Sequence, residues 1–286
     1  MRINRIKKLW REGKPAVGGW LSIPHCFQAE VMAHTGLDWL CIDMQHGCID
    51  FSDVIPMLTA VSTTNITPIV RVPWNEPYII MKVLDAGAYG VIVPMVSNRA
   101  EAERAVGACR YPPVGMRSSG PVRAVHYGGA DYVAKANDEI VVMAMIETKE
   151  GIANLDAICA TPGLDAVYIG PADLSFALGL PPRGDNPDPL HMATCDKILA
   201  AAHKAGIKCV MHCAGADFAA GAVKRRSQCV SGYSGLNPIS FASGASLFNS
   251  ATTTAFASSG VSATGSRPES INRLRNSVLP ARSRLA

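Results

Sequence analysis

Short apolar runs alternate with longer amphipathic segments along most of this chain. Each apolar run suits a buried strand, and the segments between the runs have helical spacing. Strands that are apolar on both faces are typical of a parallel sheet covered by helices. The predicted strands cover residues 17–23, 67–73, 90–96, 140–147, 165–174 and 207–213, and a further strand lies in the apolar first half of the stretch 39–47. The predicted helices cover residues 3–12, 27–35, 50–63, 77–86, 100–109, 151–159, 191–205 and 216–224.

This succession of strand-then-helix units predicts an α/β fold, a closed (β/α)₈ TIM barrel. The eighth strand is expected at Pro238–Ala242. A long excursion at 110–138 interrupts the regular order, and loops of that length are either functional or carry extra structure. From Ser227 onward Ser, Thr and Gly dominate. We therefore expect one barrel domain at 1–250 and a poorly ordered or atypical tail at 251–286.

Composition narrows the class of protein. With 286 residues, of which 48% are hydrophobic and 17% charged, the chain can bury a large core as one domain. The net charge of +4 is mild. The sequence lacks the interleaved basic and aromatic residues that are typical of nucleic-acid binding. We expect no signal peptide and no membrane span. The nine cysteines lack CxxC pairs, which favours reduced thiols and a cytoplasmic location.

The amino terminus carries five basic residues within one predicted helix and its approach. They form either a basic patch or the solvated face of a helix, and the spacing favours the solvated face. These residues are Arg2, Arg5, Lys7, Lys8 and Arg11.

Polar side chains gather where the predicted strands end. Barrel enzymes place their catalytic groups at the carboxyl ends of the strands. We therefore expect these side chains to meet at one mouth of the barrel. They are Asp43, Gln45 and His46 after the second strand, Arg71 after the third, Glu147 after the fifth and Gly170–Asp173 after the sixth.

Glu147 and Asp173 are the predicted metal ligands. Neighbouring strands can hold two carboxylates close enough to share a cation, which relieves their repulsion. Oxygen ligands suit a hard ion such as Mg²⁺ or Mn²⁺. The alternative is that both acids only cap turns. A rival zinc site at Cys209, His212 and Cys213 is less favoured, because these residues alternate faces on one strand and fit core packing.

The remaining polar groups suit chemistry beside a carbonyl. Arg71 lies between valines and points inward, so it needs an anionic partner, which is a structural acid or a substrate carboxylate or enolate. His46 can act as acid or base near neutral pH, with Asp85 fixing its tautomer. No strand ends in lysine, so metal-assisted enolate formation is favoured over a Schiff base.

Six motifs follow one another along the chain. They are Ile42-Asp-Met-Gln-His-Gly47, Val70-Arg-Val-Pro73, Leu84-Asp-Ala-Gly-Ala88, Tyr111-Pro-Pro-Val-Gly-Met-Arg117, Ile146-Glu-Thr148 and Gly170-Pro-Ala-Asp-Leu-Ser175. In this order they resemble the HpcH/HpaI class II pyruvate aldolases, and the resemblance spans about residues 5–225.

The resemblance implies a role for each site residue. Glu147 and Asp173 would bind a divalent metal (Mg²⁺, Mn²⁺ or Co²⁺, with no nucleotide), which chelates the carboxylate and ketone oxygens of pyruvate. Arg71 would stabilise the enolate oxygen, and His46 paired with Asp85 would act as acid and base. The substrate-binding set would comprise Arg71, the amides of Ala172 and Asp173, Gly170 and Trp20, with Asp43 and Gln45 supporting the site or holding water.

The resemblance also implies an assembly. Members of this family exchange their last helix between subunits and form hexamers as trimers of dimers. Two departures bear on this chain. Met145 stands where some members have Gln, which removes one polar contact near the donor. Gly244 stands where an Asp is expected, and the segment after Arg226 fits the family poorly.

We therefore predict a class II aldolase. It would reversibly cleave a 4-hydroxy-2-oxo acid to pyruvate or hydroxypyruvate and an aldehyde, through a metal-stabilised enolate. Its partners would be the small 2-oxo acid, the aldehyde and further copies of the chain, with no nucleic acid or membrane. The alternatives are a CoA-ester lyase of the citrate-lyase type and a non-catalytic barrel.

Overall fold

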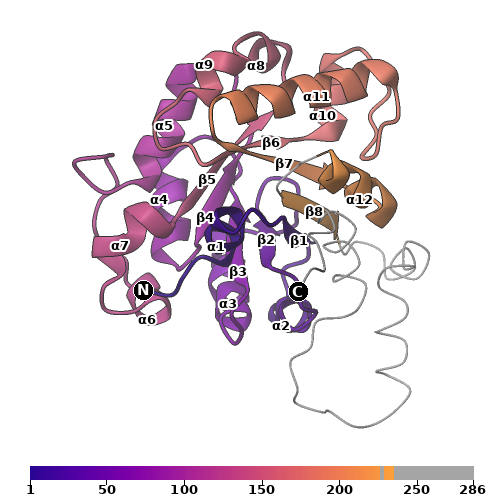
Figure 1. Cartoon of the computed structure of the whole chain (residues 1–286). Coiled ribbons are helices and arrows are strands. Elements are labelled where there is room, and N and C mark those ends of the chain that lie inside the picture. Colours follow the sequence, from indigo (N-terminus) through magenta and orange to yellow (C-terminus); the bar gives the residue numbers. More distant parts are fainter. Residues whose placement is uncertain (226–228, 235–286) are drawn as a thin grey trace, which may run out of the picture.

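The framework of the computed structural model, which describes residues 1–225 and 229–234, is a parallel sheet (Figure 1). Neighbouring strands pair in chain order, and the last strand pairs back with the first, so the sheet closes as a barrel. The predicted parallel α/β order is confirmed. The strands are β1 (Ala16–Leu21), β2 (Trp39–Asp43), β3 (Thr67–Arg71), β4 (Gly90–Val93), β5 (Val141–Ile146), β6 (Ala166–Ile169), β7 (Lys208–Cys213) and β8 (Cys229–Ser234).

Helices follow the strands and surround the sheet (Figure 1). The long excursion at 110–138 carries two helices of its own, α6 and α7. The helices are α1 (Arg5–Arg11), α2 (Cys26–Ala33), α3 (Phe51–Val61), α4 (Pro77–Asp85), α5 (Arg99–Cys109), α6 (Ala124–Gly128), α7 (Tyr132–Glu139), α8 (Lys149–Ala153), α9 (Leu155–Cys159), α10 (Pro171–Ala177), α11 (Pro189–Lys204) and α12 (Ala216–Lys224).

The strand that closes the barrel is not the one predicted. β8 begins at Cys229 and pairs with both β1 and β7, whereas the sequence predicted the eighth strand at Pro238–Ala242. That predicted segment lies outside the described residues, as do the atypical tail and the helix expected to be exchanged between subunits. The sequence from Cys229 to Ser234 is short and contains Ser and Gly, so it lacks the apolar run that marked the other strands.

Alternate residues of strands β1 to β7 build two separate cores. One set points outward and packs against the surrounding helices, as Val70 and Val142 do. The other set fills the inside of the barrel, and it includes Ile69, Met143 and Val210. Because strand side chains alternate between faces, this division fixes which polar residues at the strand ends point inward. The amino end of the interior is covered by α1, which contributes Ile6, Leu9 and Trp10 to the inner core (Figure 1).

Gly18 in β1 makes room for an inner aromatic ring. A Cβ at Gly18 would lie 2.1 Å from the Trp39 ring, far inside van der Waals contact. Trp39 is fully buried and faces β1 from the register position opposite Gly18. The glycine is therefore required by close packing of β1 against β2.

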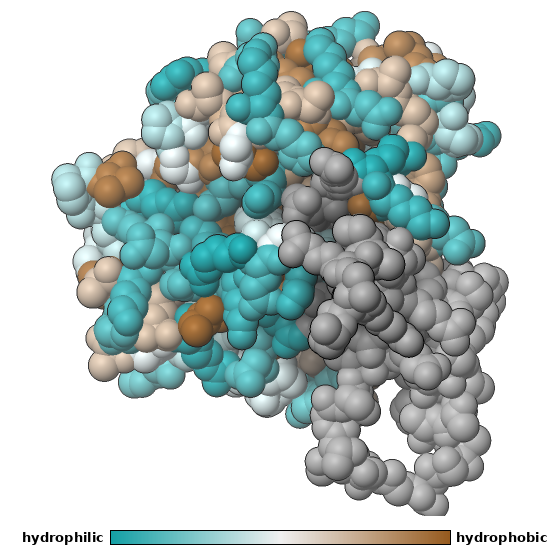
Figure 2. Space-filling view, viewed as in Figure 1, coloured by the Kyte–Doolittle hydropathy of each residue, from teal (hydrophilic) through white to brown (hydrophobic). Residues whose placement is uncertain are grey.

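Where the described residues are visible in Figure 2, they show no single apolar stripe. Hydrophilic residues cover the helices there, and apolar residues are scattered between them. Among the described residues, no helix combines the length and the apolar character that crossing a membrane requires. The eight cysteines whose side chains the structure describes are free thiols.

A buried arginine anchors the excursion to the barrel. The side chain of Arg117 is fully buried and its Nη2 donates to Asp85 Oδ1 at 2.7 Å and to Tyr132 Oη at 3.2 Å. Its guanidinium lies over the Tyr111 ring, 4.5 Å from the centroid. Tyr111 and Tyr132, which lie near the two ends of the excursion, thus both contact Arg117. The pairing of Arg117 with Asp85 ties the excursion to the end of α4.

Replacing Arg117 with Met should destabilise the fold. Removing one partner of a buried, hydrogen-bonded pair costs more than the pair contributes as a unit, and we expect a loss of about 2 kcal/mol in the free energy of unfolding. Urea unfolding at neutral pH measures it. The control is Arg99→Met, which removes an exposed pair with Glu103 and should change stability by less than about 0.5 kcal/mol. Equal unfolding midpoints for the two variants would contradict the anchoring role.

Candidate active site

The carboxyl ends of the strands surround a cavity of about 270 Å³. It brings together most of the residues that the sequence predicted for the site. The predicted residues that line it are Trp20, Asp43, His46, Arg71, Gly170, Ala172 and Asp173. Further lining residues are Ser22, Met145, Tyr168, Pro171, Gly184 and His212.

Asp43 and Arg71 form a two-fold contact in the wall of this cavity. They are register partners on β2 and β3, so both side chains reach the same level. Arg71 Nε donates to Asp43 Oδ1 at 2.7 Å, and Nη2 donates to Oδ2 at 2.5 Å. Trp20 Nε1 also donates to Oδ2, at 3.1 Å, and the guanidinium lies 4.8 Å from the centroid of the Trp20 ring. The anionic partner that Arg71 was expected to need is therefore Asp43.

The charges of this pair stabilise each other. Burial by itself would raise the pKa of Asp43, but the hydrogen bonds and positive charge of Arg71 outweigh it and hold that pKa below its usual value. Burial would likewise lower the pKa of Arg71, and Asp43 raises it instead. Both groups stay ionised at neutral pH, so Arg71 presents a fixed positive charge to the cavity.

His46 lies in the turn directly after β2 and is exposed at the cavity mouth. The same Asp43 carboxylate accepts from the backbone of this turn, from Gln45 N at 3.1 Å and His46 N at 3.4 Å. Asp43 therefore fixes both the arginine and the turn that carries the histidine. The Gln45 side chain is half-buried and does not line the cavity, and its Oε1 has no hydrogen-bond partner among the described residues.

Asp85 lies away from His46 within this chain. It is the last residue of α4, which runs from the carboxyl end of β3 toward the amino end of β4 at Gly90. His46 follows the carboxyl end of β2, so the two side chains occupy opposite ends of the barrel. The carboxylate of Asp85 accepts from Arg117 instead. The predicted pairing of His46 with Asp85 is not formed within this chain, because the end of a helix returns to the other face of the sheet.

Glu147 follows β5 and is 2% exposed. Its Oε1 accepts from Met95 N at 2.9 Å, while its Oε2 is buried with no hydrogen-bond partner among the described residues. Burial, with a contribution from the nearby negative charge of Asp173, raises the pKa of Glu147 to about 7. A buried carboxylate oxygen without a partner is the arrangement that a bound cation would compensate.

Two backbone features make room for this carboxylate. A Cβ at Gly170 would lie 2.2 Å from Glu147 Oε2, so only glycine leaves that oxygen in place. Met95, whose amide donates to Oε1, has a φ of 58°, the left-handed region that non-glycine residues rarely adopt. Backbone strain of this kind is found where the surrounding structure fixes a functional group.

Asp173 and Ala172 lie in the first turn of α10, which begins at Pro171. The backbone N–H groups of a first helical turn have no partner within the helix, so they can donate to an anion in the cavity. Asp173 is exposed, in contrast to Glu147. Among the described residues, no group of three or more His, Cys, Asp or Glu side chains could hold a metal ion. The two carboxylates, at Glu147 and Asp173, offer oxygen ligands of the kind that a hard cation prefers, and such a cation would take its other ligands from water or substrate oxygens.

His212 and Tyr168 line the cavity, and sequence reasoning did not place them in the site. Tyr168 Oη and His212 Nδ1 lie 3.0 Å apart, and the His212 ring contacts Trp20 edge-on at 4.8 Å between centroids. The outer core takes Cys209 and Cys213, so the three residues of the rival zinc site do not meet. Period-two alternation along β7 could have identified His212 as the inward residue.

His212 should make stability depend on pH. Burial, with a contribution from the Arg71 charge, lowers the pKa of His212 to about 4, whereas an unfolded histidine titrates near 6.5. Between those values the unfolded chain binds the extra proton, so the free energy of unfolding falls as pH falls, by up to about 1.4 kcal/mol per pH unit. Urea unfolding of wild type and His212→Gln from pH 7 to pH 4.5 measures this contribution, which should be missing in the variant. Parallel profiles would contradict it.

The sequence and the fold together match proteins of known family. The family model described as HpcH/HpaI aldolase/citrate lyase matches residues 17–232, from β1 into β8. The chain belongs to this family. A hydroxypyruvate/pyruvate aldolase from Rhizorhabdus wittichii is 43% identical to it over 217 residues, which cover 76% of this chain and 86% of the relative.

Two further relatives extend the comparison. A 5-keto-4-deoxy-D-glucarate aldolase from Escherichia coli O139:H28 is 40% identical over 187 residues, covering 65% of this chain and 73% of the relative. The crystal structure of an HpcH/HpaI aldolase/citrate lyase family protein from Burkholderia cenocepacia J2315 superposes with a TM-score of 0.78 and 33% identity. It covers 84% of this chain and 96% of its own. The family and its aldolase members place the chain among carbon–carbon lyases.

Proposed function

We propose that this protein is a divalent-metal-dependent class II aldolase. It cleaves 4-hydroxy-2-oxo acids to an aldehyde and pyruvate or hydroxypyruvate, and it also catalyses the reverse addition. The observation that carries the proposal is the buried Glu147 carboxylate, whose Oε2 has no hydrogen-bond partner among the described residues. The resemblance of the site motifs to class II aldolases and the names of two relatives support the substrate class.

A divalent cation held by Glu147 and Asp173 would supply positive charge beside the ketone of the 2-oxo acid. The chain's own groups complete the binding site. The first-turn amides of Ala172 and Asp173 would hold the carboxylate of the acid. Gly170 leaves the space that this pose needs, because any side chain there would meet Glu147.

Arg71 would stabilise the charge that develops during cleavage. Its Nε and Nη2 donate to Asp43, which leaves Nη1 to donate to the developing enolate oxygen. Because Asp43 fixes the guanidinium before substrate arrives, little reorganisation is needed as the charge forms. Trp20 packs against the same guanidinium and shields the contact from water.

His46 would move the protons. In the cleavage direction it removes the proton of the C4 hydroxyl, the C3–C4 bond breaks, and its electron pair forms the enolate while the aldehyde leaves. Protonation of the enolate at C3 then gives the 2-oxo acid. Asp43 orients His46 through the turn that it caps, without touching the imidazole.

Release of pyruvate from a 4-hydroxy-2-oxo acid tests the proposal. The released pyruvate is followed through its reduction by lactate dehydrogenase. We expect activity to disappear after treatment with a chelator and to return on addition of Mg²⁺, Mn²⁺ or Co²⁺. Activity that resists the chelator would contradict the metal dependence, and covalent trapping of pyruvate by borohydride would indicate a lysine imine mechanism instead.

The assembly and the location of the protein stay predictions. We propose a homohexamer of the type that the family resemblance implies, in the cytoplasm. The carboxyl-terminal helix that would be exchanged between subunits falls in the part of the sequence outside the described residues.

A further inference from the structure

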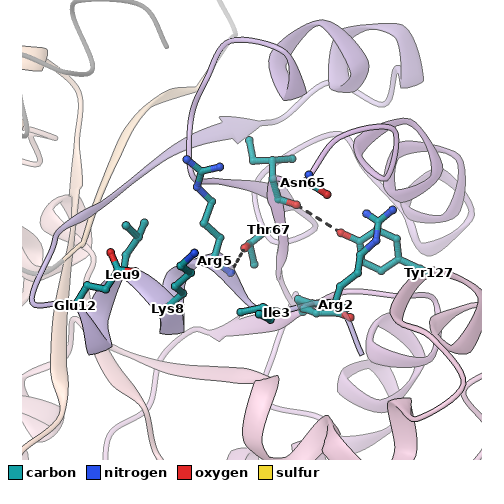
Figure 3. A pocket seen from close by; sticks show the side chains of 11 residues that line it. Arg2, Ile3, Arg5, Lys8, Leu9, Glu12, Asn65, Thr67 and Tyr127 are labelled. Atoms are coloured by element: carbon teal, nitrogen blue, oxygen red, sulfur yellow. Dashed lines mark hydrogen bonds between the residues drawn. The ribbon is translucent and has the colours of Figure 1, made fainter. Parts of the chain in front are cut away.

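A second cavity, of about 590 Å³, opens at the opposite end of the barrel (Figure 3). It lies beside α1, where β3 begins at Thr67 and where Tyr89 precedes β4. The active-site residues follow the other ends of these strands, so the two cavities are separate. The lining residues are Arg2, Ile3, Arg5, Lys8, Leu9, Glu12, Asn65, Ile66, Thr67, Tyr89 and Tyr127.

The basic residues at the amino terminus divide between different surroundings. Lys7 pairs with Asp165 at 2.9 Å, and Arg11 is exposed and does not line the cavity. The other three, Arg2, Arg5 and Lys8, line it. The interpretation of this segment as a simple solvated face is therefore incomplete. Viewed from this end, hydrophilic residues lie over α1 (Figure 2).

Arg5 is held in place by a buried acid. Its Nε donates to Asp38 Oδ1 at 2.9 Å, and the Asp38 side chain is fully buried. Asp38 Oδ2 also accepts from Val17 N, and Arg5 N donates to Thr67 Oγ1. The position of Arg5 is thus fixed by the barrel, while its two Nη atoms make no hydrogen bond with another described residue.

Arg2 faces the cavity from another side and is also fixed. Its guanidinium lies 4.4 Å from the centroid of the Tyr127 ring, and its Nη1 donates to Thr64 O at 3.1 Å. Figure 3 shows Arg5 and Arg2 on either side of Asn65. The Lys8 side chain is exposed and makes no ion pair within the part of the chain that the structure describes. Glu12 is the one acid among the lining residues.

We infer that this cavity binds a small organic anion bearing carboxylate or phosphate groups. Three cations line the cavity beside one acid, Glu12, and Asp38 behind the wall contacts Arg5 through Nε, which leaves the Nη atoms of Arg5 to face a ligand. Two of the cations are already oriented, so an oxyanion would gain charge-assisted hydrogen bonds at a low cost in side-chain entropy. The volume suits an organic molecule, and Leu9, Ile66 and Tyr89 supply apolar wall for its body. Residues at the amino end of a barrel usually contribute to the stability of the fold. That contribution does not account for an open cavity with cationic walls.

Calorimetric titration of the full-length protein with succinate and with inorganic phosphate tests the inference. The two probes separate a carboxylate ligand from a phosphate ligand, and binding of either supports the site. Lys8→Met should weaken binding by about tenfold, the effect of losing one charge-assisted contact. Arg11→Met, on the same helix but outside the cavity, should bind as wild type does. Pyruvate release should be unchanged in both variants.

A further variant distinguishes anion binding in the second cavity from anion binding in the active site. Arg71→Met removes the cation of the catalytic cavity, and we expect it to keep the binding that Lys8→Met weakens. Binding that disappears in Arg71→Met and survives in Lys8→Met would overturn the inference, and so would the absence of saturable binding of both probes at millimolar concentrations. The experiment does not depend on the proposed aldolase activity, so either can fail alone.

Discussion

Glu147→Gln should abolish the response of the protein to divalent metal and, after chelator treatment, make it more stable than wild type at pH 8. The substituted amide keeps the acceptor that Met95 N contacts but carries no charge. Burial raises the pKa of Glu147 to about 7, so the ionised side chain of the metal-free protein lowers the free energy of unfolding at pH 8. We expect the variant to gain about 2 kcal/mol. The same change should reduce kcat at least about 10³-fold, because the charge beside the ketone is lost.

Thermal unfolding at pH 8 with and without Mn²⁺ measures the stability of the metal-free protein and its response to the metal. Wild type should gain stability on adding the metal, and Glu147→Gln should not. Glu150→Gln is the matched control, because Glu150 is exposed only three residues further along the chain and should leave the metal response unchanged. A Glu147→Gln protein that is still stabilised by Mn²⁺ to the wild-type extent would show that the ligand set is wrong.

Arg71→Lys should reduce kcat by about 10²- to 10³-fold, the range for removing one donor that stabilises a developing oxyanion. Lysine keeps the charge, but its ammonium cannot span both oxygens of Asp43 and also donate to an enolate. Arg71 makes the two contacts through Nε and Nη2. The loss should therefore fall mainly on kcat, with a smaller change in KM.

A double-mutant cycle separates positioning from charge. Asp43→Asn breaks the same pair from the other side, and the two substitutions together should cost far less than the product of their separate effects. Steady-state kinetics of the four proteins gives this coupling. Multiplicative effects would mean that Asp43 does not act through Arg71.

Sequence reasoning identified most of the residues that line the mouth of the barrel, and it did not identify their pairing. Asp43 and Arg71 both end predicted strands, so their common location followed from the parallel order. Their bidentate contact depends on the register of β2 against β3, which no single-strand pattern specifies. Asp43 was expected in a supporting or water-holding role, and its place as the partner of Arg71 emerges only from the structure.

Asp85 and His212 show two limits of pattern reading. Asp85 belongs to a motif that resembles the family, but its helix carries it to the other end of the barrel, where Arg117 binds it. His212 lies within an apolar strand and fitted core packing, yet its alternation with the outer-core cysteines points it into the cavity. The chain's closing strand was misplaced for a related reason, since β8 is recognised by its pairing with β1 and β7 rather than by its composition.

Exchange of the pyruvate methyl protons in D₂O tests the central claim most directly, because it reports enolate formation without any aldehyde. The protein is loaded with diamagnetic Mg²⁺, which leaves the spectra sharp, and is mixed with pyruvate, and the methyl signal is followed by proton NMR. We predict that the signal decays, that a chelator stops the decay, and that Glu147→Gln never shows it. A methyl signal that stays constant with the metal-loaded protein, or that decays equally after chelation, would contradict the account.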